Sequence, residues 1–304
     1  MRSKEEIVEY ARESGIDLIG FTDAAPQYEG LAIFRHWLNS GRAGKMGWLY
    51  RNIDKRFNPG VILEGARTVI CIAINYFSCM DPPGSLVSRY VRSRDYHKVL
   101  KDKLGKLYTF MKQSDPGLIA RAFVDTAPIA EKALAQRAGL GWQGKNSLLI
   151  TERFGSWVFL GELVINREYP VDRPCPDRCG TCRACVDACP SHAIKEDRTV
   201  DARLCISYLT IEFKDVFTDL QKSIIRKNRM IFGCDTCQEV CPWNKNPFST
   251  IEPGFRQQHD LSYYTIEKLR CLDREEFYRL RRNTVLDRIT YEQFLRNIAA
   301  LRQG

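Results

Sequence analysis

Eight of the twelve cysteines in this chain fall between Cys179 and Cys241, and their spacing indicates electron-transfer chemistry. One run, CGTCRACVDACP, has two, two and three residues between successive cysteines and ends at Pro190. This spacing is typical of bacterial two-cluster ferredoxins, in which the first three thiolates bind one 4Fe–4S cluster and the fourth binds the other. Because disulfides are rare in the cytosol, we interpret the run as a metal site that passes single electrons.

A second run, CDTCQEVCP, repeats the pattern but lacks its first cysteine, which Cys205 between the two runs can supply. We therefore predict two interlocked ligand sets: Cys179, Cys182, Cys185 and Cys241 for one cluster, and Cys189, Cys205, Cys234 and Cys237 for the other. Structural zinc is the alternative, but zinc sites seldom use two interlocked runs that each end in Cys-Pro. The cysteines left over are Cys71, which we expect to be a small buried hydrophobe, and Cys79, Cys175 and Cys271.

The part of the chain before these cysteines must position whatever receives the electrons. We expect helices over 3–14 and 98–111, a helix with Pro128 in its first turn that ends at Gly139, and strands over 16–22, 66–76, 120–126, 146–151 and 156–166. This mixture predicts an α+β or α/β domain over residues 1–168. A proline-rich stretch then opens a cysteine-rich domain over 169–246, and we expect a short helical tail over 247–304. G-x-x-x-x-G-K-[ST] does not occur, so no P-loop is predicted. G-x-G-x-x-G occurs once, as GLGWQG over 139–144, but it follows an expected helix and precedes an expected strand, the reverse of the order in a Rossmann site, so no Rossmann site is predicted.

Composition and charge limit the class of protein. The chain has 304 residues, is 44% hydrophobic and carries a net charge of +9. Its longest apolar runs are far shorter than the roughly 20 residues of a membrane-spanning helix, and its N-terminus lacks the apolar region of a signal peptide. We therefore expect a soluble, cytoplasmic protein without membrane contact. Basic residues gather over 86–112, 222–229 and 279–282, which predicts either a nucleic-acid-binding surface or ordinary solvated helix faces.

Several long motifs occur in a characteristic order along the chain. They are KRFNP, GARTVICIAINY, SRYVRSRDYHKVL, VDTAPIAEKALAQRAGLGWQGKNSLLI, FGSWVFLGELV, the first cysteine run, CISYLTIE and GCDTCQEVCPWN. Together they resemble the epoxyqueuosine reductase family over most of the chain, to about residue 250.

The resemblance implies a cobalamin-dependent iron–sulfur enzyme related to reductive dehalogenases. Its N-terminal domain would hold cobalamin in a nitroreductase-like α+β fold, and a ferredoxin-like domain with two 4Fe–4S clusters would supply the electrons. The implied reaction removes the epoxide oxygen of epoxyqueuosine in the anticodon loop of tRNA and gives queuosine. This conversion consumes two electrons and two protons.

The reaction needs a proton donor, because an alkoxide is a poor leaving group unless it is protonated. Asp125, at the end of an expected strand in VDT, matches the catalytic aspartate of the family. We expect burial beside a large apolar macrocycle to raise its pKa and keep it protonated. The alternative is that Asp125 merely caps the helix expected to begin near Pro128.

Motif alignment with the family also implies a set of cobalamin contacts: Arg56, Tyr96, Asp125, Leu149, Thr151, Leu160, Ser207 and Tyr208. Arg56 can pair with a propionamide oxygen or with the phosphate of the nucleotide tail. Ser207 and Tyr208 follow Cys205 closely and are placed to bridge cofactor and cluster. The cobalt-ligating pattern D-x-H-x-x-G is absent, so His97 is expected to be a surface histidine or one behind the site.

The implied partners are tRNA and an external reductant such as a ferredoxin or flavodoxin, and we expect a monomer. Binding of the tRNA backbone would fall steeply with salt, and the modified base would have to leave its stack to reach a buried site. The candidates for phosphate contacts are Arg89, Arg92, Arg94, Lys98 and Lys101. Two other functions stay open: a cobalamin-dependent reductase of a small molecule such as an organohalide, and a non-catalytic electron carrier.

Overall fold

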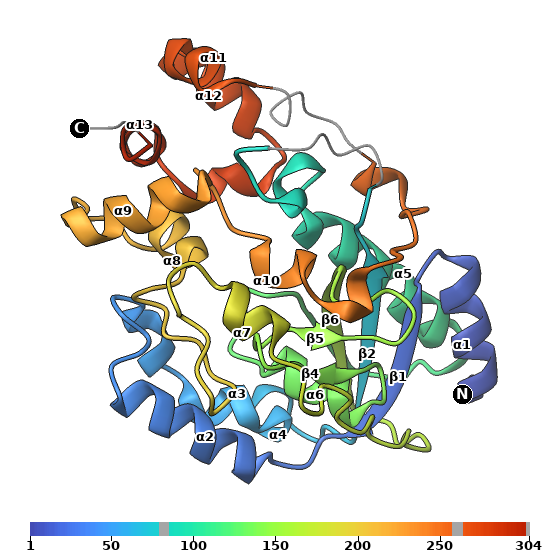
Figure 1. The fold of residues 1–304 in the computed structure, drawn as a ribbon. Helices are drawn as coiled ribbons and strands as arrows, with labels where there is room; N and C mark the ends of the chain where they lie inside the picture. The colour runs from blue at the N-terminus through green and yellow to red at the C-terminus, as the bar shows by residue number, and fades with distance from the viewer. Residues whose placement is uncertain (79–84, 257–263, 302–304) are drawn as a thin grey trace.

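The computed structural model describes residues 1–78, 85–256 and 264–301 (Figure 1). Its first part contains α1 Lys4–Glu13, β1 Leu18–Asp23, α2 Tyr28–Asn39, η1 Gly47–Tyr50, α3 Ile53–Phe57, α4 Pro59–Ile62, β2 Thr68–Asn75, η2 Arg89–Arg92, α5 Tyr96–Ser114, β3 Ala120–Phe123, α6 Glu131–Arg137, β4 Trp142–Gln143, β5 Leu149–Ile150 and β6 Val158–Ile165. The remainder contains α7 Ala184–Ala188, α8 Ile206–Ile211, α9 Asp219–Asn228, α10 Thr236–Glu239, η3 Pro242–Asn244, η4 Pro253–Phe255, α11 Ile266–Cys271, α12 Arg274–Arg281, η6 Val285–Arg288 and α13 Tyr291–Ala299. Cys79 lies outside the described residues.

A four-stranded antiparallel sheet with the strand order β1–β2–β6–β3 supports the first part of the chain. Strands β2 and β6 pair along their full lengths, from Thr68 opposite Ile165 to Asn75 opposite Val158. Every residue of β2 is buried, as expected for a strand that is covered on both faces. The short strand β3 pairs with β6 and ends two residues before Asp125, so the sheet fixes where the loop that carries Asp125 begins.

Helices cover both faces of this sheet. Helices α1 and α5, to the right of the sheet in Figure 1, pack on one face, and α5 buries Leu100, Leu104, Leu107 and Met111 at helical spacing. Helix α6 packs on the opposite face. The contact is close because β1 carries Gly20 there, and a Cβ at this position would lie 2.0 Å from the carbonyl oxygen of Ala138. The sheet is therefore held between two apolar layers.

A buried polar network joins the cysteine-rich part to the sheet domain. Asn244 Nδ2 donates to Ser156 Oγ at 2.9 Å and to the Gln238 carbonyl oxygen at 2.7 Å, and the Ser156 N–H donates to Asn244 Oδ1 at 2.8 Å. Gln238 Oε1 in turn accepts from Ser156 Oγ at 3.0 Å and from the Tyr76 hydroxyl at 3.3 Å. Because these groups satisfy one another, the network can be buried at little cost and fixes the relative position of the two parts.

The tail folds back onto both preceding parts, at the top of Figure 1. Helices α11 to α13 and η6 share an apolar cluster with Leu86 and Val91 of the first part and with Phe232 of the cysteine-rich part. Asn297 Nδ2 also donates to the carbonyl oxygens of Thr210 and Ile231, at 2.8 and 2.9 Å. The tail is thus part of the folded core, and η6 at its centre lies near the sheet domain.

The α+β architecture predicted from the sequence is confirmed, and Ser3 and Glu6 form the expected capping box at the start of α1. The prediction that Pro128 lies in the first turn of a helix is wrong. Helix α6 begins at Glu131, because the chain between Val124 and Ala130 forms tight turns instead. The domain boundaries at residues 168 and 246 stay predictions. In the described part of the chain, no helix is long and apolar enough to cross a membrane.

Candidate functional site

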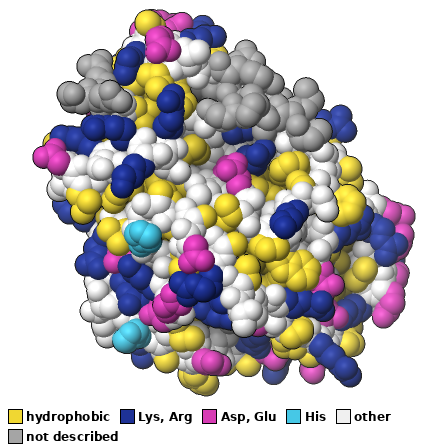
Figure 2. Space-filling view, viewed as in Figure 1, with side chains coloured by type: hydrophobic (Ala, Val, Ile, Leu, Met, Phe, Trp, Pro, Cys, Tyr) yellow, Lys and Arg dark blue, Asp and Glu magenta, His cyan; other side chains and the backbone are white. Residues whose placement is uncertain are grey.

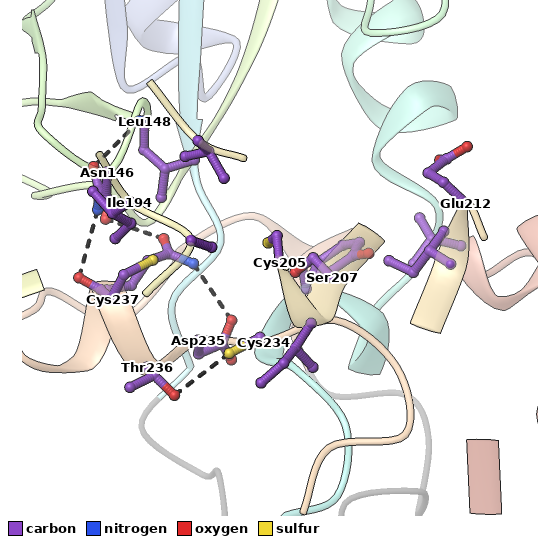
Figure 3. A pocket seen from close by; sticks show the side chains of 18 of the residues that line it. Asn146, Leu148, Ile194, Cys205, Ser207, Glu212, Cys234, Asp235, Thr236 and Cys237 are labelled. Carbon is purple, nitrogen blue, oxygen red and sulfur yellow. Dashed lines mark hydrogen bonds between the residues drawn. The ribbon is translucent and has the colours of Figure 1, made fainter. Parts of the chain in front are cut away.

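A cavity of about 660 Å³ lies where the sheet domain, the cysteine-rich part and the tail meet. We call it the inner cavity, and Figure 3 shows it from close by. All three parts of the chain contribute side chains to its wall, among them Tyr96, Asp125, Phe159, Cys205, Ser207, Glu212, Val285 and Arg288. A cavity built in this way can form only when the whole chain has folded.

One predicted ligand set lines the inner cavity: Cys189, Cys205, Cys234 and Cys237. Figure 3 shows that Cys205 and the Cys234–Cys237 pair reach the cavity from separate stretches of the chain. Two of the sulfurs accept hydrogen bonds, Cys189 Sγ from the Ala193 N–H at 3.3 Å and Cys234 Sγ from Asn228 Nδ2 at 3.0 Å. Such donors stabilise negative charge on a ligating sulfur and thereby tune the reduction potential of a cluster.

The other predicted set, Cys179, Cys182, Cys185 and Cys241, lines a separate cavity of about 200 Å³, which we call the outer cavity. Trp243 lines this cavity and packs edge-on against the fully buried Trp142, with ring centroids 4.7 Å apart. Lys145 Nζ donates to the carbonyl oxygens of Gly180 and Cys182, at 2.8 and 2.7 Å, and holds the cysteine loop in place. Cys182 is exposed, so this cavity reaches the protein surface.

The cysteines suit a multi-iron cluster in their geometry and in their chemistry. Cys205 and Cys241 precede α8 and η3 with the same backbone angles, φ −68° and ψ 126°. Burial raises the pKa of both thiols, while backbone N–H groups of the following turn pull in the opposite direction, so thiolates form when a metal supplies positive charge. No three His, Cys, Asp or Glu of residues 1–78, 85–256 and 264–301 converge to hold a single metal ion. Each set surrounds a cavity instead.

Asp125 lies in the loop between β3 and α6 and has a left-handed backbone conformation, with φ 53°. Its N–H donates to Glu131 Oε1, and this hydrogen bond holds the left-handed backbone in place. Asp125 does not cap α6, since the N-cap residue is Ala130 and no side chain bonds there. Its carboxyl instead opens onto the inner cavity with 40% of the side chain exposed.

Two cations meet the same oxygen of Asp125. His97 Nε2 and Arg288 Nη1 each lie 3.2 Å from Asp125 Oδ2, and Arg288 also pairs with Glu212. Burial alone would raise the pKa of Asp125, but the His97 hydrogen bond and the Arg288 charge outweigh it and lower this pKa. These two cations favour the ionised form of Asp125, and the expectation that burial beside a macrocycle raises its pKa stays a prediction. No local pattern in the sequence indicates that His97 and Arg288 meet at Asp125.

His97 is held between two carboxylates. Its Nδ1 lies 2.7 Å from Asp95 Oδ1, and its Nε2 faces Asp125. Burial lowers the pKa of His97, but hydrogen bonds with Asp125 and Asp95 and their charges outweigh it and raise this pKa to about 9. His97 therefore lies behind the cavity wall as a cation at neutral pH, as one of the two alternatives from the sequence expected.

Aromatic rings form one wall of the inner cavity. Tyr96 stacks on Phe159 with ring centroids 4.1 Å apart, and Phe159 stacks on Tyr76 at 4.3 Å. His97 stacks on the other side of Tyr96 at 4.1 Å. The wall is rigid and apolar, and its far end carries the cation that faces Asp125.

Of the eight predicted cobalamin contacts, some line the inner cavity and others do not. Among the eight, Tyr96, Asp125 and Ser207 line the inner cavity. Leu149 and Leu160 are buried in the apolar layer under α6, and Thr151 Oγ1 bonds the Gly155 carbonyl oxygen within a turn. The Tyr208 hydroxyl accepts from the Lys45 N–H at 2.7 Å, and the Arg56 guanidinium lies 5.6 Å from the ring centre of Phe34. None of these five residues lines the inner cavity.

The basic side chains proposed for phosphate contacts differ in exposure. Arg92 is only 5% exposed and donates to the Val87 carbonyl oxygen, so a direct phosphate contact by Arg92 is excluded by its burial. Arg89 packs over Phe77 and Trp157. Lys98 and Lys101 are both exposed, and Lys98 donates to Asn283 Oδ1. On the face in Figure 2, Lys and Arg side chains are spread between acidic and hydrophobic ones and do not form one stripe.

The sequence interpretation missed four acidic or basic residues around Asp125: Glu131, Glu162, Glu212 and Arg288. Arg288 lies 163 positions from Asp125, and no local pattern connects them. Glu162 did carry a signal, because it is the one charged residue in the apolar strand VFLGELVI. A lone carboxyl in such a strand indicates a buried and therefore functional or paired group.

Two known protein families match this chain. Residues 178–244 match the 4Fe-4S double cluster binding domain, and residues 56–126 match the family described as epoxyqueuosine reductase QueG. Together with the two cysteine-lined cavities, the first match defines the protein as an oxidoreductase with two 4Fe–4S clusters.

Relatives that match nearly the whole chain identify the family within this class of oxidoreductases. An epoxyqueuosine reductase from Xanthomonas campestris is 40% identical over 95% of this chain and 83% of its own length. The solved structure of an epoxyqueuosine reductase from Bacillus subtilis, with its catalytic aspartate loop swung out of the active site, superposes with a TM-score of 0.89 at 29% identity, over 98% of this chain and 80% of that one. Another structure, with an epoxyqueuosine-modified tRNA stem loop, gives 0.90 at 29% identity over the same shares. The chain belongs to the epoxyqueuosine reductase family.

Proposed function

We propose that this protein removes the epoxide oxygen of epoxyqueuosine in the anticodon loop of tRNA and produces queuosine. The observation that carries this proposal is that Asp125 and one four-cysteine set line the same cavity. A proton donor and an electron source thus face one space, as a reaction that consumes two electrons and two protons requires. A solved relative bound to an epoxyqueuosine-modified tRNA stem loop supports the substrate.

Cobalamin is the proposed second cofactor, and the inner cavity fits it. The aromatic wall of Tyr76, Tyr96 and Phe159 suits an apolar macrocycle, while Asn146 and Ser207 offer polar groups to its amide-bearing edge. Both ring nitrogens of His97 face carboxylates, so His97 would not be a ligand of the cofactor's metal. When bound, cobalamin would supply a reduced metal centre next to carbon. Besides the lining residues, we propose Arg56, Leu149, Thr151, Leu160 and Tyr208 as contacts, on family alignment alone.

Asp125 is the proposed acid that delivers a proton to the departing oxygen. In the substrate-free site its pKa is lowered, so the acid form is scarce at neutral pH. An anionic phosphate of the substrate that draws Arg288 away would raise this pKa and provide the acid when it is needed. The Bacillus subtilis relative, with its catalytic aspartate loop swung out, supports both the role and a movable loop.

We propose that electrons enter at the outer cavity and leave from the inner one. The ligands are the two cysteine sets defined above, and exposed Cys182 marks the entry side. An external one-electron donor such as a ferredoxin or flavodoxin fits this entry. We further propose that the protein works as a cytoplasmic monomer, with the domain boundaries that the sequence predicts.

The proposal is tested with purified protein to which cobalamin is added. We expect a bound-corrin visible spectrum and, with a strong reductant, conversion of epoxyqueuosine-containing tRNA. The Asp125→Asn variant should keep both clusters and the corrin but lose turnover by about 10²–10⁴-fold. A protein that binds no corrin would refute the cofactor and leave an electron carrier as the better interpretation. Normal turnover by Asp125→Asn would refute the assignment of the acid.

A further inference from the structure

We propose that Arg288, held in place by Glu212, contacts a phosphate of the substrate at the inner cavity, and that this phosphate replaces Asp125 at the guanidinium. The inference rests on the proposed function, since the phosphate is one of the two that flank epoxyqueuosine in tRNA. Arg288 is then a substrate-binding residue, and Glu212 is the positioning residue that acts through it. The exchange frees Asp125 only when substrate is bound.

Arg288 is the one cation in the wall of the inner cavity. Among the residues that the structure describes, no other Lys or Arg lines this cavity. The remaining charged residues of the lining are carboxyls: Asp125, Glu212 and Asp235. His97 stacks on Tyr96 outside the lining, and only 15% of its side chain is exposed. An anion that enters the cavity is therefore attracted by Arg288 and repelled by the other charged side chains of the wall.

The backbone of Arg288 is fixed, whereas its side chain reaches into the cavity. Arg288 ends η6, in which Val285 and Leu286 are buried in the apolar cluster of the tail. The guanidinium extends from this turn to the inner cavity, and 35% of the side chain is exposed. A guanidinium carries five N–H donors in a planar fork, so it can bind two anions at once. The tail thus presents a cation from a rigid base.

The two carboxylates that hold Arg288 do so unequally. Nη1 lies 3.2 Å from Asp125 Oδ2, which is long for a hydrogen bond between charged groups. Nη2 donates to Glu212 Oε1, and Glu212 is the less exposed of the two acids, at 24% against 40%. Glu212 is also fixed at the end of α8, whereas Asp125 lies in the loop between β3 and α6. An incoming anion should therefore displace Asp125 and leave Glu212 bound.

Asp125 keeps a second partner when Arg288 leaves it. His97 Nε2 lies 3.2 Å from the same Oδ2 atom and comes from α5, not from the tail. The phosphate offers two unbridged oxygens, which match the guanidinium fork. After the exchange Arg288 faces the phosphate and Glu212 in place of Asp125 and Glu212, so it still binds two anions.

The exchange changes the charge around Asp125. In the substrate-free site burial raises the pKa of Asp125, but the His97 hydrogen bond and the Arg288 charge lower it overall. A phosphate that takes up the Arg288 charge, and adds a negative charge nearby, raises this pKa again. The acid form is then favoured in the complex with substrate and disfavoured in the free enzyme.

The first experiment measures binding to the holoenzyme. The probe is a labelled anticodon stem-loop that carries epoxyqueuosine, and its Kd is determined over a range of salt concentrations. Arg288→Ala should bind it about tenfold more weakly, and the slope of log Kd against log salt should fall by about 0.7, as for one lost contact to a single-stranded phosphate. Arg281→Ala is the matched control, because Arg281 pairs with Asp287 on the same tail. Iron content and Tm verify that each variant is folded.

Neutral phosphates locate the contact. Two further stem-loops carry a methylphosphonate, one on the 5′ side and one on the 3′ side of epoxyqueuosine. One of them should bind the wild type about tenfold more weakly and yet bind Arg288→Ala as well as the normal stem-loop does, because both changes remove the same interaction. Equal binding of all three stem-loops by the wild type, or losses that add up in Arg288→Ala, would overturn the phosphate contact.

Glu212→Gln separates anchoring from repulsion. Without the Glu212 charge, Arg288 pairs with Asp125 alone, so the normal stem-loop should bind several-fold more weakly, and Glu212→Asp should restore part of the affinity. If Glu212 merely repelled the phosphate, its neutralisation would strengthen binding. Unchanged or tighter binding by Glu212→Gln would therefore refute the anchor.

The second experiment tests the release of the acid with pre-reduced holoenzyme. The pH dependence of kcat/KM follows the free enzyme and that of kcat follows the complex. The pH above which kcat falls should lie higher than the pH above which kcat/KM falls, and in Arg288→Ala the two should coincide. Coincidence in the wild type would refute the release.

Other groups act on Asp125 in both states. The charged and titratable side chains that do so are Tyr96 and His97 from α5, Glu131 and Lys132 from α6, Arg56 from α3 and Arg288 from η6, with Glu212 from α8 acting through Arg288. Of these, Arg288 is the one that the exchange moves, so its removal is the change that should close the gap between the two pH limits.

Failure of this inference differs from failure of the proposed function. A wild type that binds no stem-loop, or converts no epoxyqueuosine, would refute the function. Normal turnover by Asp125→Asn would refute the acid, while the binding experiment would still decide whether Arg288 contacts a phosphate. Conversion by the wild type together with unchanged binding in Arg288→Ala would refute the phosphate contact alone.

Discussion

The outer and inner cavities present four cysteines each, yet their surroundings differ in kind. The outer cavity is small, packed against Trp142 and Trp243, and reaches the surface at Cys182. The inner cavity is more than three times larger and adds Asp125, Glu212 and Arg288 to its cysteines. Acidic groups therefore line the inner cavity together with its cysteines, whereas the charged side chains that line the outer cavity are Lys145 and Arg178.

This difference teaches that two similar sets of cysteine ligands can serve opposite ends of one electron-transfer path. A cluster near the surface is reached by a redox partner, whereas a cluster whose cavity opens onto an acid can couple electrons to protons. The cysteine pattern is nearly symmetric, so the asymmetry comes from what the rest of the chain places around it.

The largest effects should come from cysteine substitutions. Cys205→Ser and Cys182→Ser should each lower the iron content from roughly eight to roughly four atoms per chain. A small chemical reductant should still support turnover in Cys182→Ser, because it can reach the inner cluster without a protein partner, but not in Cys205→Ser. Turnover assays with both kinds of donor check this, with Cys271→Ser on the exposed tail as control. Equal loss in both variants with the chemical reductant would contradict separate entry and exit roles.

Stability should depend on pH through the inner cavity. The pKa of His97 is raised to about 9, so the stabilisation it provides is complete below its unfolded pKa of about 6.5 and is lost as pH rises through 9. The difference in unfolding free energy between wild type and His97→Gln should thus be up to about 3 kcal/mol at pH 6 and should vanish above pH 9. Denaturant unfolding across this range measures it. The control is Lys145→Met at the outer cavity. Its difference from the wild type in unfolding free energy should be constant between pH 6 and 9.

The charge of Arg288 should set the pH above which activity is lost. Removal of this cation in Arg288→Ala raises the pKa of Asp125, so that pH should move upward by about 0.5–1 pH unit. Rate–pH profiles under saturating tRNA test this prediction. Arg281→Ala is the matched control, because Arg281 pairs with Asp287 on the same tail. A pH limit that stays in place or moves downward would contradict the role of Arg288.

The smallest effect should be on potential. Asn228→Ala removes the donor to Cys234 Sγ and should lower the midpoint potential of the inner cluster. A hydrogen bond that differs by about 1 kcal/mol between redox states corresponds to roughly 40 mV for one electron. A redox titration monitored by electron paramagnetic resonance should show this shift of the midpoint potential in one cluster only. A shift in both clusters would mean that the two are not electronically distinct.

The sequence alone was sufficient where the determinants are local. The capping box at Ser3 and Glu6 and the amphipathic spacing of α5 follow from neighbouring residues, and both form as predicted. The cysteine spacing likewise led to two sets that line two separate cavities.

The charge state of Asp125 could not be predicted from the sequence, for a physical reason. Its position after a strand follows from local pattern, but its pKa depends on His97 and Arg288, which are 28 and 163 positions away. Its partial burial acts in the expected direction, yet two distant cations reverse the net result. Electrostatics of a site built from three parts of a chain cannot be read from any one of them.

The interlocked cysteine order has a consequence for synthesis on the ribosome. The outer cavity takes three cysteines from the first run but its fourth, Cys241, from the second, and the inner cavity waits for Cys237. Neither set is complete until nearly four-fifths of the chain has emerged, and the inner wall still lacks Arg288 at that moment. Iron–sulfur assembly on this protein is therefore a late event, and a nascent chain cut short before residue 237 would carry reactive thiols without a complete cysteine set for either cluster.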